Sequence, residues 1–85
     1  MEQSQPIIFY QVYYEYKCYD DCYFDASVYN YRTYEESLNC YSNLINTCKD
    51  DYDNYEENIY DDFDIDFKYE NACECVFCSV RKVVL

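Results

Sequence analysis

Several residue types are scarce or missing in this 85-residue chain, and each absence removes a class of function. Glycine and histidine are absent, so there is no glycine-rich phosphate loop and no imidazole to act as a general base near neutral pH. No stretch approaches the roughly 20 apolar residues of a membrane helix. The first six residues lack the basic and apolar regions of a secretory signal. We therefore expect a cytoplasmic protein that makes no membrane contact, is not an enzyme and needs no cofactor.

Basic residues are scarce as well. Six lysines and arginines stand against 18 aspartates and glutamates, a formal net charge of −12. An AT-rich gene would explain 14 tyrosines and the missing glycines, but it should also be rich in lysine, and this chain has only four. The scarcity of lysine therefore indicates selection for negative charge. We expect a basic protein surface as partner, because nucleic acid and anionic membranes would repel the chain.

Apolar residues make up 51% of the chain and aromatic residues 22%, which favours a folded domain over a disordered acidic segment. The length suits a single domain, residues 1–85. Seven cysteines in a chain without a secretory signal are expected to be reduced thiols. Their odd number also excludes a complete set of intramolecular disulfides.

The N-terminal half predicts two strands and a helix. Residues at period two predict a strand at Ile7–Cys18, and a second strand at about Tyr23–Tyr31 would close a hairpin with it. The turn between them, at 19–22, contains aspartate, which can adopt the left-handed conformation. Thr33 and Glu36 form a capping box, so a helix should begin at Thr33. The apolar stripe of this helix consists of Tyr34, Leu38, Tyr41, Ile45 and Cys48.

The C-terminal half predicts two more strands. Residues 50–58 are polar and acidic, and predict a loop or a short frayed helix. Phe63–Tyr69 alternates apolar with charged residues, as a half-buried strand does. Cys75–Val84 is apolar on both faces and predicts a central strand. The fold class is therefore α+β, an antiparallel sheet of about four strands in the order β-β-α-β-β, packed on one helix.

The densest acidic segment, residues 50–66, has nine acidic residues among 17 and no basic residue. On the predicted strand, Asp62, Asp64 and Asp66 would project from one face about 6.6–6.8 Å apart. That separation is comparable to the distance between neighbouring phosphates along a nucleic-acid strand. Such a row could meet the lysines and arginines that normally grip a phosphate backbone. The alternative is a solvated face that only keeps the protein in solution.

Three tyrosines lie inside this acidic segment. Tyrosine is rigid and amphipathic, is enriched at interface hot spots, and can stack under arginine. The alternative is ordinary packing combined with codon bias. The expected partner-binding residues are Asp50, Asp51, Asp53, Glu56, Glu57, Asp61, Asp62, Asp64, Asp66 and Glu70, together with Tyr52, Tyr55 and Tyr60.

The cysteines raise the alternative of a zinc site. Cys18 and Cys22, with Cys75 and Cys78 and the neighbouring Cys73, could supply four thiolates. However, no glycine is present to shape a zinc knuckle, and free cysteine is often simply buried. We expect no metal.

In length and acidity, but in no motif, the chain resembles phage-encoded inhibitors of bacterial defence and repair: anti-CRISPR proteins, anti-restriction DNA mimics and uracil-DNA glycosylase inhibitors. The resemblance implies a viral or mobile-element protein that works in the host cytoplasm and occupies the nucleic-acid site of its target. We favour an anti-CRISPR protein that blocks DNA binding by a Cas effector, over an inhibitor of a restriction or DNA-repair enzyme. A tyrosine-rich structural or homodimeric viral protein and a zinc-held adaptor stay open as alternatives.

Overall fold

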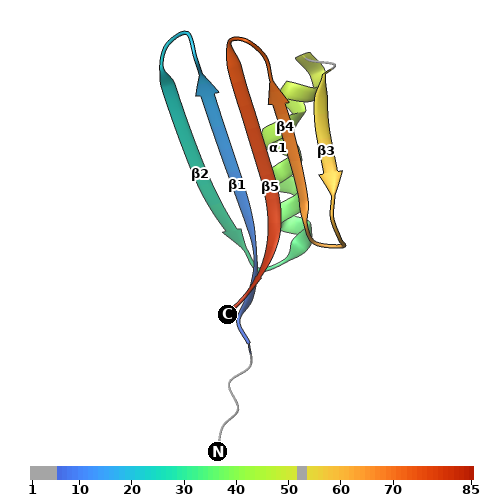
Figure 1. Cartoon of the computed structure of the whole chain (residues 1–85). Helices are drawn as coiled ribbons and strands as arrows, with labels where there is room; N and C mark the ends of the chain where they lie inside the picture. Colours follow the sequence, from blue (N-terminus) through green and yellow to red (C-terminus); the bar gives the residue numbers. More distant parts are fainter. Residues whose placement is uncertain (1–5, 52–53) are drawn as a thin grey trace, which may run out of the picture.

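The described part of the chain forms one antiparallel sheet with a single helix packed on one face (Figure 1). The computed structural model describes residues 6–51 and 54–85, with the side chains at 47, 50 and 51 outside that description. The elements, in chain order, are β1 (Ile8–Cys18), β2 (Tyr23–Tyr31), α1 (Tyr34–Asp51), β3 (Tyr55–Ile59), β4 (Ile65–Glu70) and β5 (Glu74–Val84). The expectation of a small α+β domain is met, with five strands instead of about four.

The last strand of the chain lies at the centre of the sheet, because the strand order is β2-β1-β5-β4-β3. On one side β5 pairs with β1, where Val80 lies opposite Val12. On the other side β5 pairs with β4, where Cys78 lies opposite Phe67. A central strand has neighbours on both edges, so the run of apolar residues at 75–84 correctly predicted its position.

The core lies between α1 and the face of the sheet that it covers. Its buried residues are Val12, Phe67, Tyr69, Val76, Cys78 and Val80 from the sheet and Tyr41, Ile45 and Cys48 from the helix. The predicted helical stripe is confirmed for these three residues. Leu38 is only half-buried, because Ser37 takes the buried position and donates its hydroxyl to the carbonyl of Tyr34 at 2.6 Å.

The predicted capping box begins the helix. The Glu36 amide donates to the Thr33 hydroxyl at 3.2 Å, and that hydroxyl donates to the Glu36 carboxylate at 2.9 Å. The hairpin turn at 19–22 also forms, but the residue with positive φ is Cys22, at 54°, and not an aspartate. Among the described residues, no helix is both long and apolar enough to span a membrane.

The expectation of a loop or frayed helix at 50–58 is wrong for residues 55–58, whereas positions 52 and 53 of that range lie outside the described residues. The helix continues to Asp51, and residues 55–59 form the edge strand β3, which pairs with β4 so that Glu57 lies opposite Phe67. Two adjacent glutamates break the alternation that identifies a strand in the sequence. The strand forms here because β4 offers it an unpaired backbone edge.

The expected start of the next strand is also wrong, since β4 begins at Ile65 instead of Phe63. The Asp61 carboxylate accepts hydrogen bonds from the amides of Phe63 and Asp64, at 2.8 and 2.9 Å. An aspartate that bonds backbone amides two and three residues ahead holds a turn. The chain therefore stays in a turn where the alternating sequence predicted an extended strand.

Candidate acidic interaction surface

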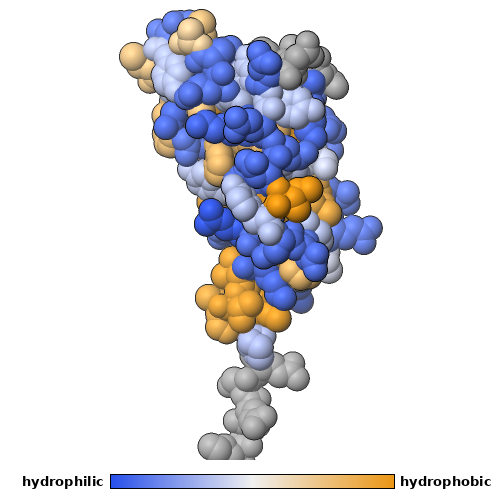
Figure 2. Space-filling model, turned by 45° about the vertical axis from the view of Figure 1, so that its right-hand side comes forward, coloured by the Kyte–Doolittle hydropathy of each residue, from blue (hydrophilic) through white to orange (hydrophobic). Residues whose placement is uncertain are grey.

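Most of the acidic residues that the sequence singled out lie along one edge of the sheet. They belong to β3, to β4 and to the turn between these strands. Figure 2 brings this side of the molecule forward and shows that hydrophilic residues cover most of it. Residues 54–70 carry seven carboxylates and one ammonium group, that of Lys68. We call the seven residues the acidic edge: Glu56, Glu57, Asp61, Asp62, Asp64, Asp66 and Glu70.

Four of the predicted binding residues come before the acidic edge in the sequence. Asp50 and Asp51 are the last residues of α1, and their side chains lie outside the description. Tyr52 and Asp53 lie outside the described residues altogether. The acidic edge is therefore built only from residues 56–70.

The regular row expected for Asp62, Asp64 and Asp66 does not form. Only Asp66 lies within β4, whereas Asp62 and Asp64 lie in the turn that precedes it. Side chains in a turn do not share one face at the constant spacing of a strand. The prediction of carboxylates spaced like phosphates on one strand face is thus wrong.

The acidic edge instead carries charge on both faces of the sheet. Glu56 and Glu57 are consecutive in β3, so they point to opposite faces. On the helix side, Glu57 accepts hydrogen bonds from the Tyr41 hydroxyl at 2.7 Å and from the Lys49 ammonium group at 3.2 Å. Glu56 lies opposite Lys68 on the other face, which we call the open face.

A hollow of about 390 Å³ lies at the acidic edge, where Glu56 and Glu70 lie near Lys68. Its lining consists of Asn54, Tyr55, Glu56, Lys68 and Glu70. A guanidinium or ammonium group from a partner could enter this hollow and meet the two carboxylates, neither of which forms an ion pair with Lys68 within the described residues.

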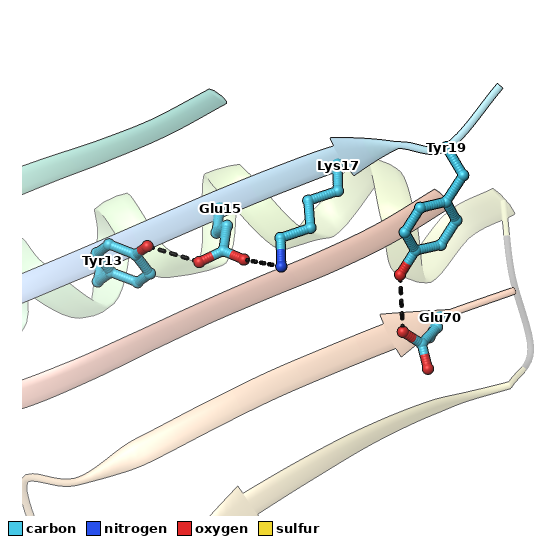
Figure 3. Close-up of polar contacts among 5 residues, drawn as sticks. All are labelled: Tyr13, Glu15, Lys17, Tyr19 and Glu70. Carbon is cyan, nitrogen blue, oxygen red and sulfur yellow. Dashed lines mark hydrogen bonds and ion pairs between the residues drawn. The ribbon is translucent and has the colours of Figure 1, made fainter. Parts of the chain in front are cut away.

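Tyrosine hydroxyls, more than basic side chains, hold the carboxylates of the acidic edge. The Tyr60 hydroxyl donates to Asp66 at 2.8 Å. The Tyr19 hydroxyl donates to Glu70 at 3.0 Å, reaching across the end of β5 to the end of β4 (Figure 3). Within residues 6–51 and 54–85, neither Asp66 nor Glu70 forms an ion pair. A phenol is a neutral donor, so it fixes the position of a carboxylate and leaves its negative charge in place.

The same arrangement recurs elsewhere on the sheet. The Tyr13 hydroxyl donates to Glu15 at 2.6 Å, and Lys17 pairs with the same carboxylate at 3.2 Å (Figure 3). The Tyr16 hydroxyl donates to Glu74 at 3.0 Å. Part of the unusual tyrosine content therefore serves to organise carboxylates in a chain that has few lysines.

These hydrogen bonds keep the phenols protonated. The bond to Glu74, followed by desolvation, raises the pKa of Tyr16 to about 12. The bonds to Glu70 and Asp66 likewise raise the pKa values of Tyr19 and Tyr60 above their ordinary value. A carboxylate disfavours a second negative charge on the oxygen that donates to it. Each pair therefore carries a single negative charge at neutral pH.

The turn that carries Asp61 and Asp62 is anchored by an aromatic cluster. The Phe63 ring lies 5.2 Å from the Tyr34 ring at the start of α1, and 5.7 Å from the Tyr10 ring of β1. Lys82 places its Nζ 4.7 Å from the centre of the Phe63 ring. Aromatic and cation–π contacts of this kind hold the turn against the helix side of the sheet.

The two described tyrosines of the predicted set differ in role. Tyr60 is 67% exposed and available to a partner. The Tyr55 ring packs 5.2 Å from the Phe67 ring, with the Lys49 Nζ 5.6 Å from its centre, so it also supports the fold. Sequence reasoning missed Tyr19, which lies 51 residues from its partner Glu70, because nothing in the sequence indicates that contact.

The cysteines considered for zinc do not all converge. Cys75 and Cys78 are three residues apart on β5, so their side chains point to opposite faces of the sheet. Cys78 belongs to the buried core. Within the described part of the chain, no group of three or more cysteine, aspartate or glutamate residues is placed to hold a metal ion.

No protein-family model matches the chain, and no curated protein or solved structure is significantly similar to it.

Proposed function

We propose that this chain is a binding protein, not an enzyme, and that it offers the acidic edge to a basic surface of another protein. The observation that carries the proposal is that three carboxylates of the acidic edge, Glu57, Asp66 and Glu70, accept hydrogen bonds from tyrosine hydroxyls at 2.7–3.0 Å. A carboxylate already held in position meets a lysine or arginine with less loss of side-chain freedom than a mobile one. It also keeps the full charge that steers a basic partner towards it.

The chemistry of the acidic edge favours a nucleic-acid-binding site as the target surface. Such sites carry clustered lysines and arginines that contact phosphates. Among them we favour the DNA-binding groove of a Cas effector, a choice that rests on the resemblance in length and acidity. The proposal does not require carboxylates spaced like phosphates. The carboxylates of the acidic edge lie on both faces of the sheet and in the turn between β3 and β4.

Competition with DNA tests this proposal. The purified chain would be titrated into a guide-loaded Cas effector bound to a labelled target duplex, and release of the duplex would be followed by fluorescence anisotropy. We expect displacement that weakens as salt is raised, because salt screens exposed charges. Failure to displace DNA at low salt from any of a panel of Cas, restriction and repair proteins would overturn the proposal.

A pair of matched variants locates the surface. Asp66→Asn removes one charge from the acidic edge, and Asp25→Asn removes one charge from β2 at the opposite edge of the sheet. We expect the first variant to displace DNA less well than the second at the same salt concentration. Equal displacement by the two variants would show that total charge, and not the acidic edge, is responsible.

A further inference from the structure

Strand β2 is an edge strand without cover. Seven of its nine residues are exposed, among them Phe24 and Val28 at 58% and 51%. In Figure 1 no element lies beyond β2, and most of α1 lies behind the other strands. The backbone groups on the outer side of such a strand are a ready template for another strand.

The two edges of this sheet differ in how they are protected. The other edge strand, β3, has five residues and carries Glu56 and Glu57, so it is short and charged. In β2 only Asp25 is charged, and the strand contains neither proline nor lysine. Its pairing with β1 runs without interruption from Tyr23 to Tyr31, so no bulge turns the edge away. Apart from the single charge of Asp25, the usual devices that protect an edge from pairing are therefore missing from β2.

We propose that β2 docks against the β2 strand of a second copy of this chain, in antiparallel register, to give one sheet that continues through both copies. Antiparallel neighbours in a sheet are related by a two-fold axis perpendicular to it. This axis keeps both helices on the same side of the sheet. Two residues that lie directly opposite each other across this interface point to the same face of the sheet, so their residue numbers differ by an even number.

The sequence of β2 suits one such register. Placing Ser27 opposite Ser27 pairs all nine residues of the strand. It sets Asp25 opposite Tyr29, which can donate its hydroxyl to the carboxylate, and Ala26 opposite Val28. A register centred on Asp25 would place two aspartates directly opposite each other, which is unfavourable.

Local charge complementarity at the two ends of β2 favours a second copy as the occupant. One residue beyond the strand, the same register brings Arg32 of one copy to the 19–22 turn of the other, which carries Asp20 and Asp21. Arg32 is exposed and forms no ion pair within residues 6–51 and 54–85. The two-fold axis repeats the contact at the other end, so each dimer would contain two contacts between Arg32 and this acidic turn. A strand from a different protein would need an acidic residue of its own opposite Arg32 to make the same contact.

The salt dependence of this contact should oppose that of the acidic edge. Each copy carries a formal charge of −12, so general repulsion between copies weakens as salt is raised. Dimerisation should therefore strengthen from low to moderate salt, whereas binding of a basic partner should weaken. The dimer does not depend on the proposed function, and either can fail without the other.

Light scattering after size-exclusion chromatography, over a range of protein and salt concentrations, tests the proposal. We expect the wild-type chain to have twice its monomer mass of 10.5 kDa at moderate salt. Val28→Lys changes an exposed residue near the two-fold axis, so it should give a monomer with an unchanged circular dichroism spectrum. A wild-type chain that stays monomeric under all conditions would overturn the proposal, as would a dimer unaffected by Val28→Lys.

A charge exchange tests the register. Arg32→Glu should raise the dissociation constant of the dimer about tenfold or more, because like charges would then face each other at both ends. Adding Asp21→Arg to this variant should restore the wild-type dissociation constant. If the double variant dimerises no better than Arg32→Glu alone, the proposed register is wrong.

Discussion

The Tyr60 hydroxyl donates a hydrogen bond of 2.8 Å to Oδ2 of Asp66, and so ties the residue after β3 to a carboxylate on the open face of β4. The Asn58 amide donates to the other oxygen of the same carboxylate at 3.3 Å. Both donors are neutral, so Asp66 is held in place and stays charged. This geometry makes Asp66 a specific test of whether held carboxylates matter for binding.

We expect Tyr60→Phe to fold normally and to displace DNA from a basic partner less well than the wild type. The variant loses one exposed hydrogen bond, which contributes little to folding stability, while Asp66 gains freedom that binding must then remove. Displacement at fixed salt measures the effect. Tyr23→Phe is the control, since within the described chain the Tyr23 hydroxyl has no hydrogen bond. Equal displacement by both variants would argue against a role for the held carboxylate.

Alkaline pH should destabilise the fold through tyrosine ionisation. The pKa of Tyr16 is raised to about 12 by its bond to Glu74 and by desolvation, whereas an unfolded tyrosine ionises near about 10. A raised pKa in the folded state means that the stabilisation is complete below pH 10 and is lost as the pH rises towards 12.

Urea unfolding at pH 8 and pH 11 checks this expectation. The midpoint of the wild type should fall between the two pH values, and Tyr16→Phe should show a smaller fall because it has no phenol to ionise at this position. An identical fall in the two proteins would show that Tyr16 does not contribute to the alkaline loss.

Phe67 should be among the residues most important for stability. Its side chain has no exposed surface and lies opposite Cys78 of the central strand. We expect Phe67→Ala to cost about 3–5 kcal/mol of unfolding free energy through lost burial and a residual cavity. Ile59→Ala, at a residue that is 74% exposed, should change it by about 0.5 kcal/mol or less. Urea titrations followed by circular dichroism would separate the two, and comparable losses would contradict this description of the core.

The seven thiols should react at very different rates. Burial raises the pKa of the Cys78 thiol to about 12, so Cys78 should react with a thiol reagent only after unfolding. Cys22 is exposed and should react fastest. Cys73 is exposed too, but its bond to Asp20 raises its pKa, so it should react more slowly than Cys22. Mass spectrometry of timed alkylation would rank the sites, and early modification of Cys78 would refute the assignment.

The first half of the chain could be predicted well because its signals are local. Period-two alternation located β1, the expected closure of a hairpin located β2, and the pair Thr33 and Glu36 located the start of α1. Each of these signals lies within a few residues, which is the range over which periodicity and capping act. The apolar run at 75–84 likewise predicted the central strand.

The acidic half was predicted less well because two other contacts, one between strands and one within a turn, overrode its periodic pattern. Strand β3 forms against β4 although its own residues do not alternate. The Asp61 side chain holds a turn in which two residues of the expected strand lie. Both outcomes depend on competition between backbone partners, which a periodic pattern does not reveal.

The sequence by itself determined the net charge, the small α+β domain, the central position of the last strand and the concentration of acids between residues 50 and 66. Only the tertiary structure decided how those acids are arranged: around an edge instead of along one strand face, and held by tyrosines from distant segments such as Tyr19. The physical reason is that composition and periodicity are properties of short segments. The position of a carboxylate depends on which donors the folded backbone brings within hydrogen-bonding distance.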